Sequence, residues 1–413
     1  MYNNLSGSCE INMKTIKKQH SFQINKEFGG YWVLAGDLNK DGIAEFICVN
    51  TQQILTQGIK SHFVTSVAVH DINGNLLWIF GEPSVQKENL GYDVPCQIYD
   101  IDNDGNIEVV FCTNYNFVIL DGTTGKVKKK YDLPISTATD NIVFWRANDQ
   151  SDELNILIKE RYKEFWVFSS KWELQWKFQH PSKLHIGHHP VVLHTNIGNC
   201  LLTGFMLLNS QGEKIWELKS SKYDLSKGHF DSCQIIKNGH DYRDWLFVIS
   251  TCKAKVLTLV NGRGEILWEK HGQHFEKVSI GKHNDTNIIV VDIKDDLTKL
   301  SPEIWFIDMY GNTINKIYAG SGNSYHFYSL VQFESKDAIA IASVNAIYDL
   351  QGQCVSYLNM PNDTKGYNIF EANLTGTDHF YVLITEDLQI VMFEGVGSYL
   401  NKNLGTPQNY SLF

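Results

Sequence analysis

The chain has 413 residues, of which 43% are hydrophobic, 12% aromatic and 20% charged. These proportions are typical of a globular protein with a large core and exclude a mostly disordered chain. The formal net charge is -10, which argues against a nucleic-acid partner because binding to a phosphate backbone depends on clustered Lys and Arg.

The sequence predicts neither a secretion signal nor a membrane span. Residues 1–25 lack the apolar segment of a signal peptide, because Lys14, Lys17 and Lys18 interrupt the one candidate stretch. No apolar run is long enough to cross a bilayer, so no membrane partner is expected. The cysteines lack CxxC spacing and are expected to be buried thiols: Cys9, Cys48, Cys96, Cys112, Cys200, Cys233, Cys252 and Cys354. We expect a cytoplasmic protein; the alternative is a secreted one whose export signal is absent from this sequence.

A hairpin repeat runs along the chain. Each copy has a short hydrophobic strand, a turn of the form D/N-x-x-G and a second strand that often carries Trp, and copies recur every roughly 40 to 50 residues. Asp or Asn accepts local backbone hydrogen bonds in such a turn, and Gly supplies its positive φ. The copies lie at 67–78, 117–128, 206–216, 257–268, 304–315 and 346–356, with a weaker one at 166–176. These hairpins are predicted to be the two outer strands of propeller blades.

A second recurring element marks the first strand of each blade. Its eight copies lie at 32–37, 96–100, 142–146, 190–194, 232–236, 277–281, 328–332 and 368–372. The last blade runs out after three strands, and residues 15–24 are predicted to supply its fourth and so close the ring. We predict an all-β fold, an eight-bladed β-propeller of four-stranded antiparallel blades, as one domain over 1–413. Seven blades is the alternative, and the regular period argues against two separate β-sandwiches.

Two loops in the first two blades match the pattern D-x-[DN]-x-D-G-x-x-E. Alternating side-chain oxygens, a Gly at the sharp turn and a later carboxylate can wrap a hard cation such as Ca²⁺. The ligands would be Asp37, Asn39, Asp41 and Glu45 in one loop and Asp100, Asp102, Asp104 and Glu108 in the other. We predict structural calcium in both loops and no organic cofactor. The alternative is a turn whose carboxylates cap backbone N–H groups without a metal.

Histidine and tyrosine gather in the residues just before each first strand. In a propeller these leading loops meet at one mouth of the central channel, and imidazole and phenol suit proton transfer. The residues concerned include Tyr31, Trp32, Tyr92, His188, His189, His229, His274, Tyr325 and His326. We expect a functional site there; a zinc or manganese site built from the same histidines is an alternative.

Arginine is scarce, which makes each position informative. Arg161 and Tyr162 lie between the second and third strands of blade three, a turn expected at the same end as the leading loops. Arg161 can offer a bidentate clamp for a carboxylate.

The sequence resembles the β-propeller polysaccharide lyases, including rhamnogalacturonan lyases and lyases acting on rhamnosyl-glucuronate or ulvan. The resemblance lies in the two acidic loops, in the motifs at 187–190 (GHHP) and 228–231 (GHFD), and in the hairpin at 207–216. It implies β-elimination at a uronic acid: a clamp acidifies the C5 proton, a base removes it and an acid protonates the departing C4 oxygen.

The resemblance also implies roles for individual residues. His188 or His189, together with His229, would be base and acid, Tyr162 or Tyr325 would be an alternative proton donor, and Arg161 would neutralise the substrate carboxylate. We expect His274, Tyr92, Tyr31, Trp32 and His326 to contact the substrate.

The expected partner is therefore an acidic oligo- or polysaccharide, and a cytosolic location favours exo action on short oligosaccharides. Two other functions compete. A quinoprotein dehydrogenase shares the blade number and the hairpins, but the sequence has no adjacent cysteine pair for it. A non-catalytic calcium-loop propeller that binds carbohydrate or protein would not need the histidines at the mouth or Arg161.

Overall fold

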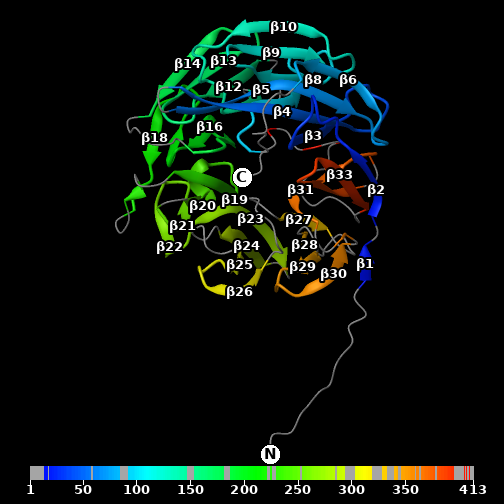
Figure 1. The fold of residues 1–413 in the computed structure, drawn as a ribbon. Coiled ribbons are helices and arrows are strands. Elements are labelled where there is room, and N and C mark those ends of the chain that lie inside the picture. Colours follow the sequence, from blue (N-terminus) through cyan, green and yellow to red (C-terminus); the bar gives the residue numbers. More distant parts are fainter. Residues whose placement is uncertain are drawn as a thin grey trace, which may run out of the picture.

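Eight sheets, each built on four antiparallel strands, form a closed ring of blades, as the repeat predicts (Figure 1). The computed structural model describes residues 14–16, 18–56, 59–83, 92–146, 153–180, 187–220, 224–225, 229–251, 254–283, 286–293, 303–318, 328–332, 339–342, 346–358, 360–361, 364–376, 379–394, 404, 406 and 409.

The first four blades each take four strands in chain order. They comprise β3 (Trp32–Gly36), β4 (Glu45–Thr56), β5 (Ile59–His70) and β6 (Leu76–Gly81); β7 (Cys96–Tyr99), β8 (Glu108–Cys112), β9 (Asn116–Asp121) and β10 (Val127–Asp132); β11 (Asn141–Arg146), β12 (Leu154–Lys159), β13 (Glu164–Ser169) and β14 (Leu174–Gln179); and β15 (Val191–Thr195), β16 (Gly198–Thr203), β17 (Met206–Leu208) and β18 (Lys214–Glu217).

The last four blades continue this pattern around the ring. They comprise β19 (Phe230–Lys237), β20 (Leu246–Thr251), β21 (Val256–Asn261) and β22 (Ile266–His271); β23 (Phe275–His283), β24 (Thr286–Ile293), β25 (Glu303–Ile307) and β26 (Thr313–Tyr318); β27 (Ser329–Gln332), β28 (Ile339–Ala342), β29 (Ala346–Asp349) and β30 (Cys354–Leu358); and β31 (Gly366–Asn373), β32 (His379–Thr385) and β33 (Gln389–Glu394). All eight predicted first strands are confirmed, and the described residues include one turn of 3-10 helix, η2 (Tyr242–Asp244).

The N-terminal strands close the ring. β2 (Lys18–Gln23) pairs antiparallel with β33 and completes the eighth blade, which confirms the predicted fourth strand. β1 (Lys14–Ile16) pairs in parallel with β30 and adds a fifth strand to the seventh blade, which the repeat did not predict. In Figure 1 both blue strands lie beside the orange and red ones. Pairing the two chain ends in this way covers edges that an open sheet would expose.

Outer-strand tryptophans join neighbouring blades. Trp216 on β18 donates its indole N–H to the carbonyl of Gly262, 2.9 Å away in the hairpin turn of the next blade. Gly264 in that turn has φ +81, and a Cβ there would lie 2.8 Å from the Trp216 ring. Trp78 and Trp268 make the same 2.9 Å hydrogen bond to the blades that follow them. The Gly of the repeat therefore serves both the turn and the contact between blades.

The described C-terminal residues lie against inner strands of the ring. The Thr406 backbone N–H donates to the carbonyl of Ala35 on β3 at 2.7 Å. Asn409 accepts from the N–H of Phe144 on β11 and donates to its carbonyl, both at 2.7 Å.

The cores lie between adjacent blades. One cluster joins Val110 and Phe117 of blade two to Ile142 and Ile156 of blade three.

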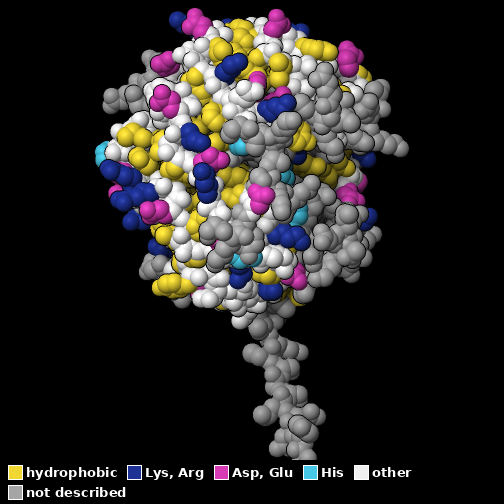
Figure 2. Space-filling model, turned by 90° about the vertical axis from the view of Figure 1, so that its left-hand side faces the viewer, with side chains coloured by type: hydrophobic (Ala, Val, Ile, Leu, Met, Phe, Trp, Pro, Cys, Tyr) yellow, Lys and Arg dark blue, Asp and Glu magenta, His cyan; other side chains and the backbone are white. Residues whose placement is uncertain are grey.

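The six cysteines that the structure describes are free thiols, five of them buried and Cys354 half-buried. In the described part of the chain, no helix is long and apolar enough to cross a membrane. On the face shown in Figure 2, acidic and basic side chains are interspersed.

Candidate functional site at the channel mouth

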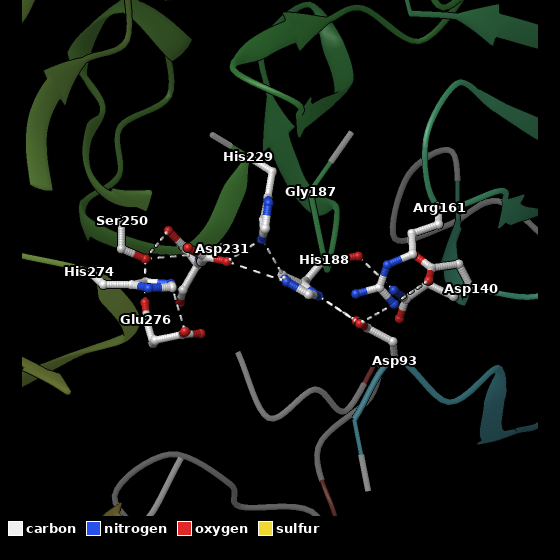
Figure 3. A network of polar contacts seen from close by, with 12 residues as sticks. Asp93, Asp140, Arg161, Gly187, His188, His229, Asp231, Ser250, His274 and Glu276 are labelled. Carbon is white, nitrogen blue, oxygen red and sulfur yellow. Dashed lines mark hydrogen bonds and ion pairs between the residues drawn. The ribbon is translucent and has the colours of Figure 1, made fainter. Parts of the chain in front are cut away.

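Five consecutive blades bring polar residues to one mouth of the channel. Asp93 lies just before β7, Asp140 before β11, His188 before β15, His229 before β19 and His274 before β23. Because each of these first strands begins at the same end of the ring, their leading loops meet there. Figure 3 shows these five residues in one polar network.

The first half of the network is a set of buried ion pairs. Arg161 Nη1 lies 3.0 Å from Asp93 and 3.5 Å from Asp140. The ammonium of Lys159 forms a buried ion pair with Asp140 and donates to the carbonyl of Gly187 at 2.7 Å. Burial alone would raise the pKa of Asp93, but the charges of His188 and Arg161 hold it well below its usual range. Asp93 is therefore a carboxylate at neutral pH.

His188 links this half of the network to the second half. Its Nδ1 lies 2.7 Å from Asp93, and its Nε2 lies 3.1 Å from Nε2 of His229. Asp231 Oδ1 lies 3.3 Å from Nε2 of His188 and 2.9 Å from Nε2 of His229. Two imidazole nitrogens and one carboxylate oxygen, atoms of the kinds that bind metal ions, thus lie close together.

Asp231 is a buried carboxylate beside two imidazoles. Among the described residues neither of its oxygens has a hydrogen-bond partner, although Nε2 of His188 and Nε2 of His229 lie close. Burial, and secondarily the charge of Glu276, raises the pKa of Asp231 to about 7. A buried acid in this state is costly unless a cation or a proton compensates it.

His274 and Glu276 extend the network into blade six. Nε2 of His274 lies 2.9 Å from Glu276 Oε1, and Asp231, His274 and Glu276 place one ligand atom each within 4.8 Å of one another. Ser250, at the end of β20, donates its hydroxyl to the backbone carbonyl of Glu276. The His229 and His274 side chains are 18% and 20% exposed, whereas that of His188 is 6% exposed, so solvent reaches the first two more readily.

A long hairpin of blade one reaches the same mouth. β4 and β5 have 12 residues each. The His62 ring on β5 lies 6.3 Å from the Tyr92 ring in an edge-to-face contact. Burial and, after it, the charge of Arg161 lower the pKa of His62. The hairpin repeat contained no sign of this extension.

Several predicted site residues lie near the network. Nδ1 of His189 faces Asn141 at 3.4 Å, and burial together with the charge of Lys159 lowers the pKa of His189 to about 4, so this ring is neutral. Tyr162 and Tyr92 are half-buried, and both lie near enough to Arg161 to influence its pKa. These residues surround the network without an identified role in it.

Other predicted contacts lie elsewhere. Trp32 is 3% exposed and donates its indole N–H to the carbonyl of Cys96 at 3.1 Å, so it packs in the core and cannot contact a substrate as predicted. Tyr31 donates its hydroxyl to the carbonyl of Glu386 at 2.6 Å and stacks on Tyr367, on the blade-eight side of the mouth. Tyr325 and His326 lie outside the described residues.

The first acidic loop follows β3. Asp37 accepts the backbone N–H groups of Asp41 and Gly42, and Asn39 donates to Glu45 at 2.8 Å. Burial, followed by the nearby Asp41 and Asp37, raises the pKa of Glu45 to about 7. The excess of acids fits a cation in this loop, while the backbone contacts match the metal-free alternative.

The second acidic loop contains an internal cation. The Lys128 ammonium on β10 lies 3.0 Å from Asp102, 3.3 Å from Asp104 and 2.7 Å from Glu108. Asp100, Asp102 and Glu108 do converge closely enough to hold a metal. However, Lys128 already sits among these carboxylates, so the loop does not fit a calcium ion unless Lys128 moves away.

The acids of the network were not assigned from the sequence. Asp93, Asp140 and Asp231 all fall at or just before the start of a first strand, in blades two, three and five. A recurring Asp at that position is the signal that could have identified them. Glu276 is likewise an acid at the start of a first strand, in blade six, whereas Lys159 carries no comparable signal because it is one polar residue at the end of a second strand.

The fold and the site define a β-propeller with a buried polar network at one mouth. The chain matches no family model and no curated protein. Solved structures with a similar fold include the exotype rhamnogalacturonan lyase YesX, with a TM-score of 0.59 and 14% identity over 92% of this chain and 75% of that chain. The rhamnogalacturonan lyase YesW has a TM-score of 0.60 and 14% identity over 92% of this chain and 75% of that chain. The V. cholerae biofilm matrix protein Bap1 has a TM-score of 0.58 and 13% identity over 93% of this chain and 91% of that chain. At these identities the similarity establishes the shared fold alone.

Proposed function

We propose that the protein is a lyase that cleaves uronic-acid glycosides in acidic oligosaccharides by β-elimination. The observation that carries the proposal is the network at the channel mouth, where buried carboxylates orient imidazoles that solvent can reach. Groups suited to proton transfer at neutral pH, held by buried charges, are typical of catalytic sites. The similar fold of two rhamnogalacturonan lyases supports the substrate class.

His229 and His274 are the candidates for proton transfer. Both imidazoles are partly exposed, and both lie beside Asp231. In β-elimination the base takes the proton from C5, the C5–H electron pair forms the C4–C5 double bond, and the C4–O bond breaks. The acid returns a proton to the departing oxygen. His188 is more deeply buried and positions His229 through the contact between their Nε2 atoms.

Arg161 acts as a positioning residue in this proposal. Its guanidinium already pairs with Asp93 and Asp140, and its side chain is 14% exposed. Its charge is therefore largely balanced inside the protein before a substrate arrives. The sequence-based hypothesis of an Arg161 clamp for the substrate carboxylate has less support from this geometry than an orienting role for Asp93.

The test is a search for unsaturated product. Purified protein is mixed with rhamnogalacturonan, ulvan and rhamnosyl-glucuronate oligosaccharides, and the ultraviolet absorbance of an unsaturated uronate is followed. We expect product with at least one substrate, loss of activity of about 100-fold or more in His274→Ala, and unchanged activity in the matched control His194→Ala. His194 is an exposed imidazole on β15 that pairs with Asn199, away from the network. Absence of product from every substrate would refute the lyase proposal.

A non-catalytic sugar-binding propeller is the second candidate. The similar fold of a biofilm matrix protein favours it. This candidate predicts that the same oligosaccharides bind, as measured by calorimetry, without forming unsaturated product.

A further inference from the structure

We propose that His188, His229 and Asp231 bind one divalent transition-metal ion at the channel mouth. The three ligand atoms, Nε2 of each imidazole and Oδ1 of the carboxylate, are separated by 3.1, 3.3 and 2.9 Å. Zinc-type sites with bonds of about 2.0 to 2.1 Å at tetrahedral angles place their ligand atoms about 3.3 Å apart. The triangle is thus slightly tighter than a filled site and needs only a small expansion to accept an ion.

Among the described residues, the hydrogen bond between the Nε2 atoms of His188 and His229 accounts for only part of this arrangement. Asp93 lies 2.7 Å from Nδ1 of His188, and a carboxylate accepts a hydrogen bond from an N–H, so when the ring is neutral its proton is on Nδ1. Nε2 of His188 then carries a lone pair, which can accept from Nε2 of His229 at 3.1 Å, and it lies 3.3 Å from Asp231, whose oxygens accept no hydrogen bond from the described residues. Two lone-pair atoms facing each other in a buried site repel unless a cation or a proton lies between them.

The residues behind His188 support its ring in the way that neighbouring groups support metal-bound histidines. A metal-bound imidazole usually donates its other N–H to a carboxylate, which fixes the ring orientation and raises the basicity of the ligand. Asp93 takes this place at Nδ1, and Arg161 holds Asp93 from the opposite side at 3.0 Å. Figure 3 shows Arg161, Asp93, His188 and His229 following one another in this order.

The ligand set selects the class of ion. Two imidazoles and one carboxylate suit zinc, manganese, iron, cobalt or nickel, whereas calcium and magnesium prefer all-oxygen sites. His229 is 18% exposed, so the site is reachable from solvent and leaves room for water or substrate as a further ligand. The acidic loops of blades one and two are all-oxygen sites and therefore compete poorly for such an ion.

A bound metal ion would also reduce the repulsion between the acids of the site and a uronate substrate. This point rests on the proposed function. Among the described residues, the network contains two basic side chains, Lys159 and Arg161, which pair with Asp93 and Asp140, and two further acids, Asp231 and Glu276, which contact histidines in it. Such a site repels a uronate unless a further cation is present. A divalent ion on His229 would supply that charge. His229 would then be a ligand and not a proton carrier, and His274, beside Glu276, would take the C5 proton and return it to the departing C4 oxygen.

The test measures metal binding with and without catalysis. Full-length protein is stripped with a chelator, supplied with excess Ca²⁺ to fill the oxygen sites, and titrated with Co²⁺ and Zn²⁺ by visible spectroscopy and calorimetry. We expect about one ion per chain, with the visible bands of low-coordinate Co²⁺ bound to nitrogen. We expect at least 100-fold weaker binding in His229→Ala and Asp231→Ala, and wild-type binding in His194→Ala and in His274→Ala.

The outcomes separate the two proposals. Metal binding by His274→Ala together with loss of its activity supports both proposals. Stoichiometric binding without activity on any substrate supports the metal site and refutes the lyase. Wild-type protein that binds no Co²⁺ or Zn²⁺, or variants His229→Ala and Asp231→Ala that bind as tightly as the wild type, would overturn the metal proposal. The first of these results needs only wild-type protein. The test therefore remains decisive even if a variant does not fold.

Discussion

Asp93 is the residue on which both halves of the mouth depend. It is 4% exposed and contacts Arg161 on one side and His188 on the other. It therefore fixes which nitrogen of His188 carries the proton and where the ring points. Asp93 reaches neither solvent nor His229 in the contacts that the structure shows, so we assign it a positioning role.

We predict that Asp93→Asn weakens Co²⁺ binding and activity by about 10- to 100-fold without unfolding the protein. The amide keeps the shape of the carboxylate but cannot orient His188 with a full negative charge. Calorimetry and the ultraviolet assay measure the two effects, and the control is Glu217→Gln, a half-buried acid on β18 that pairs with Lys214. Wild-type affinity and activity in Asp93→Asn would contradict the positioning role.

Arg161 is predicted to act mainly on stability. Arg161→Met leaves the carboxylates of Asp93 and Asp140 without one of their cations, and breaking a buried pair costs about 3 to 5 kcal/mol. The free energy of unfolding is measured by chemical denaturation, with Arg161→Lys as the variant that keeps the charge. Unchanged stability together with a raised KM would instead assign Arg161 to the substrate, as the sequence resemblance implied.

At the scale of elements, the two acidic loops share one motif but differ in their surroundings. Lys128 fills the second loop, whereas the corresponding position on β6 is Leu77, which is 48% exposed. The motif therefore describes a loop that can bind a cation, and the neighbouring strand determines whether that cation is calcium or a lysine.

We predict that wild-type protein binds at most one Ca²⁺, in the first loop, and that Lys128→Met allows a second to bind. The change removes the ammonium and leaves the carboxylates of Asp102, Asp104 and Glu108 to be neutralised by an ion. Calorimetric stoichiometry is the measurement, and Lys130→Met on the same strand is the control. Two calcium ions bound to the wild type would show that Lys128 is readily displaced.

The contact between Trp216 and the next hairpin turn is a second feature at this scale. Gly264→Ala introduces a Cβ 2.8 Å from the Trp216 ring at a positive φ, and we expect it to destabilise the protein by about 1 to 3 kcal/mol. Gly376→Ala, also at positive φ but with nothing within 4 Å, isolates the backbone part of the effect. Thermal unfolding of the two variants is compared; equal losses would mean that the contact between blades contributes nothing.

At the scale of the whole molecule, ring closure depends on the N-terminal strands. Removal of residues 1–24 deletes β1 and β2 and exposes the edges of β30 and β33. We predict a lower Tm and association through the exposed strands, measured by thermal unfolding and size-exclusion chromatography. Removal of residues 1–13, which precede both strands, is the control. A monomer with an unchanged Tm after removal of 1–24 would show that the ring does not need this closure.

The whole fold was predictable because its signals are local. The D/N-x-x-G turns and the first strands repeat within each blade, so the period identified eight blades and the completing strand β2. β1 was missed because a three-residue strand carries no pattern. The site was predictable only in part. Asp93 and His188 are 95 residues apart in different blades, and Lys128 and Asp104 are 24 residues apart in one blade. Their contacts depend on the packing of blades and of strands within a blade, which no local pattern encodes.

The most direct test of the account is a crystal structure of His274→Ala with a bound uronate oligosaccharide and Zn²⁺. We predict that the ion lies on His188, His229 and Asp231, and that the uronate carboxylate of the sugar faces the ion at the channel mouth. A sugar bound at the opposite end of the channel or on the acidic loops, with these three side chains free of metal, would contradict the account.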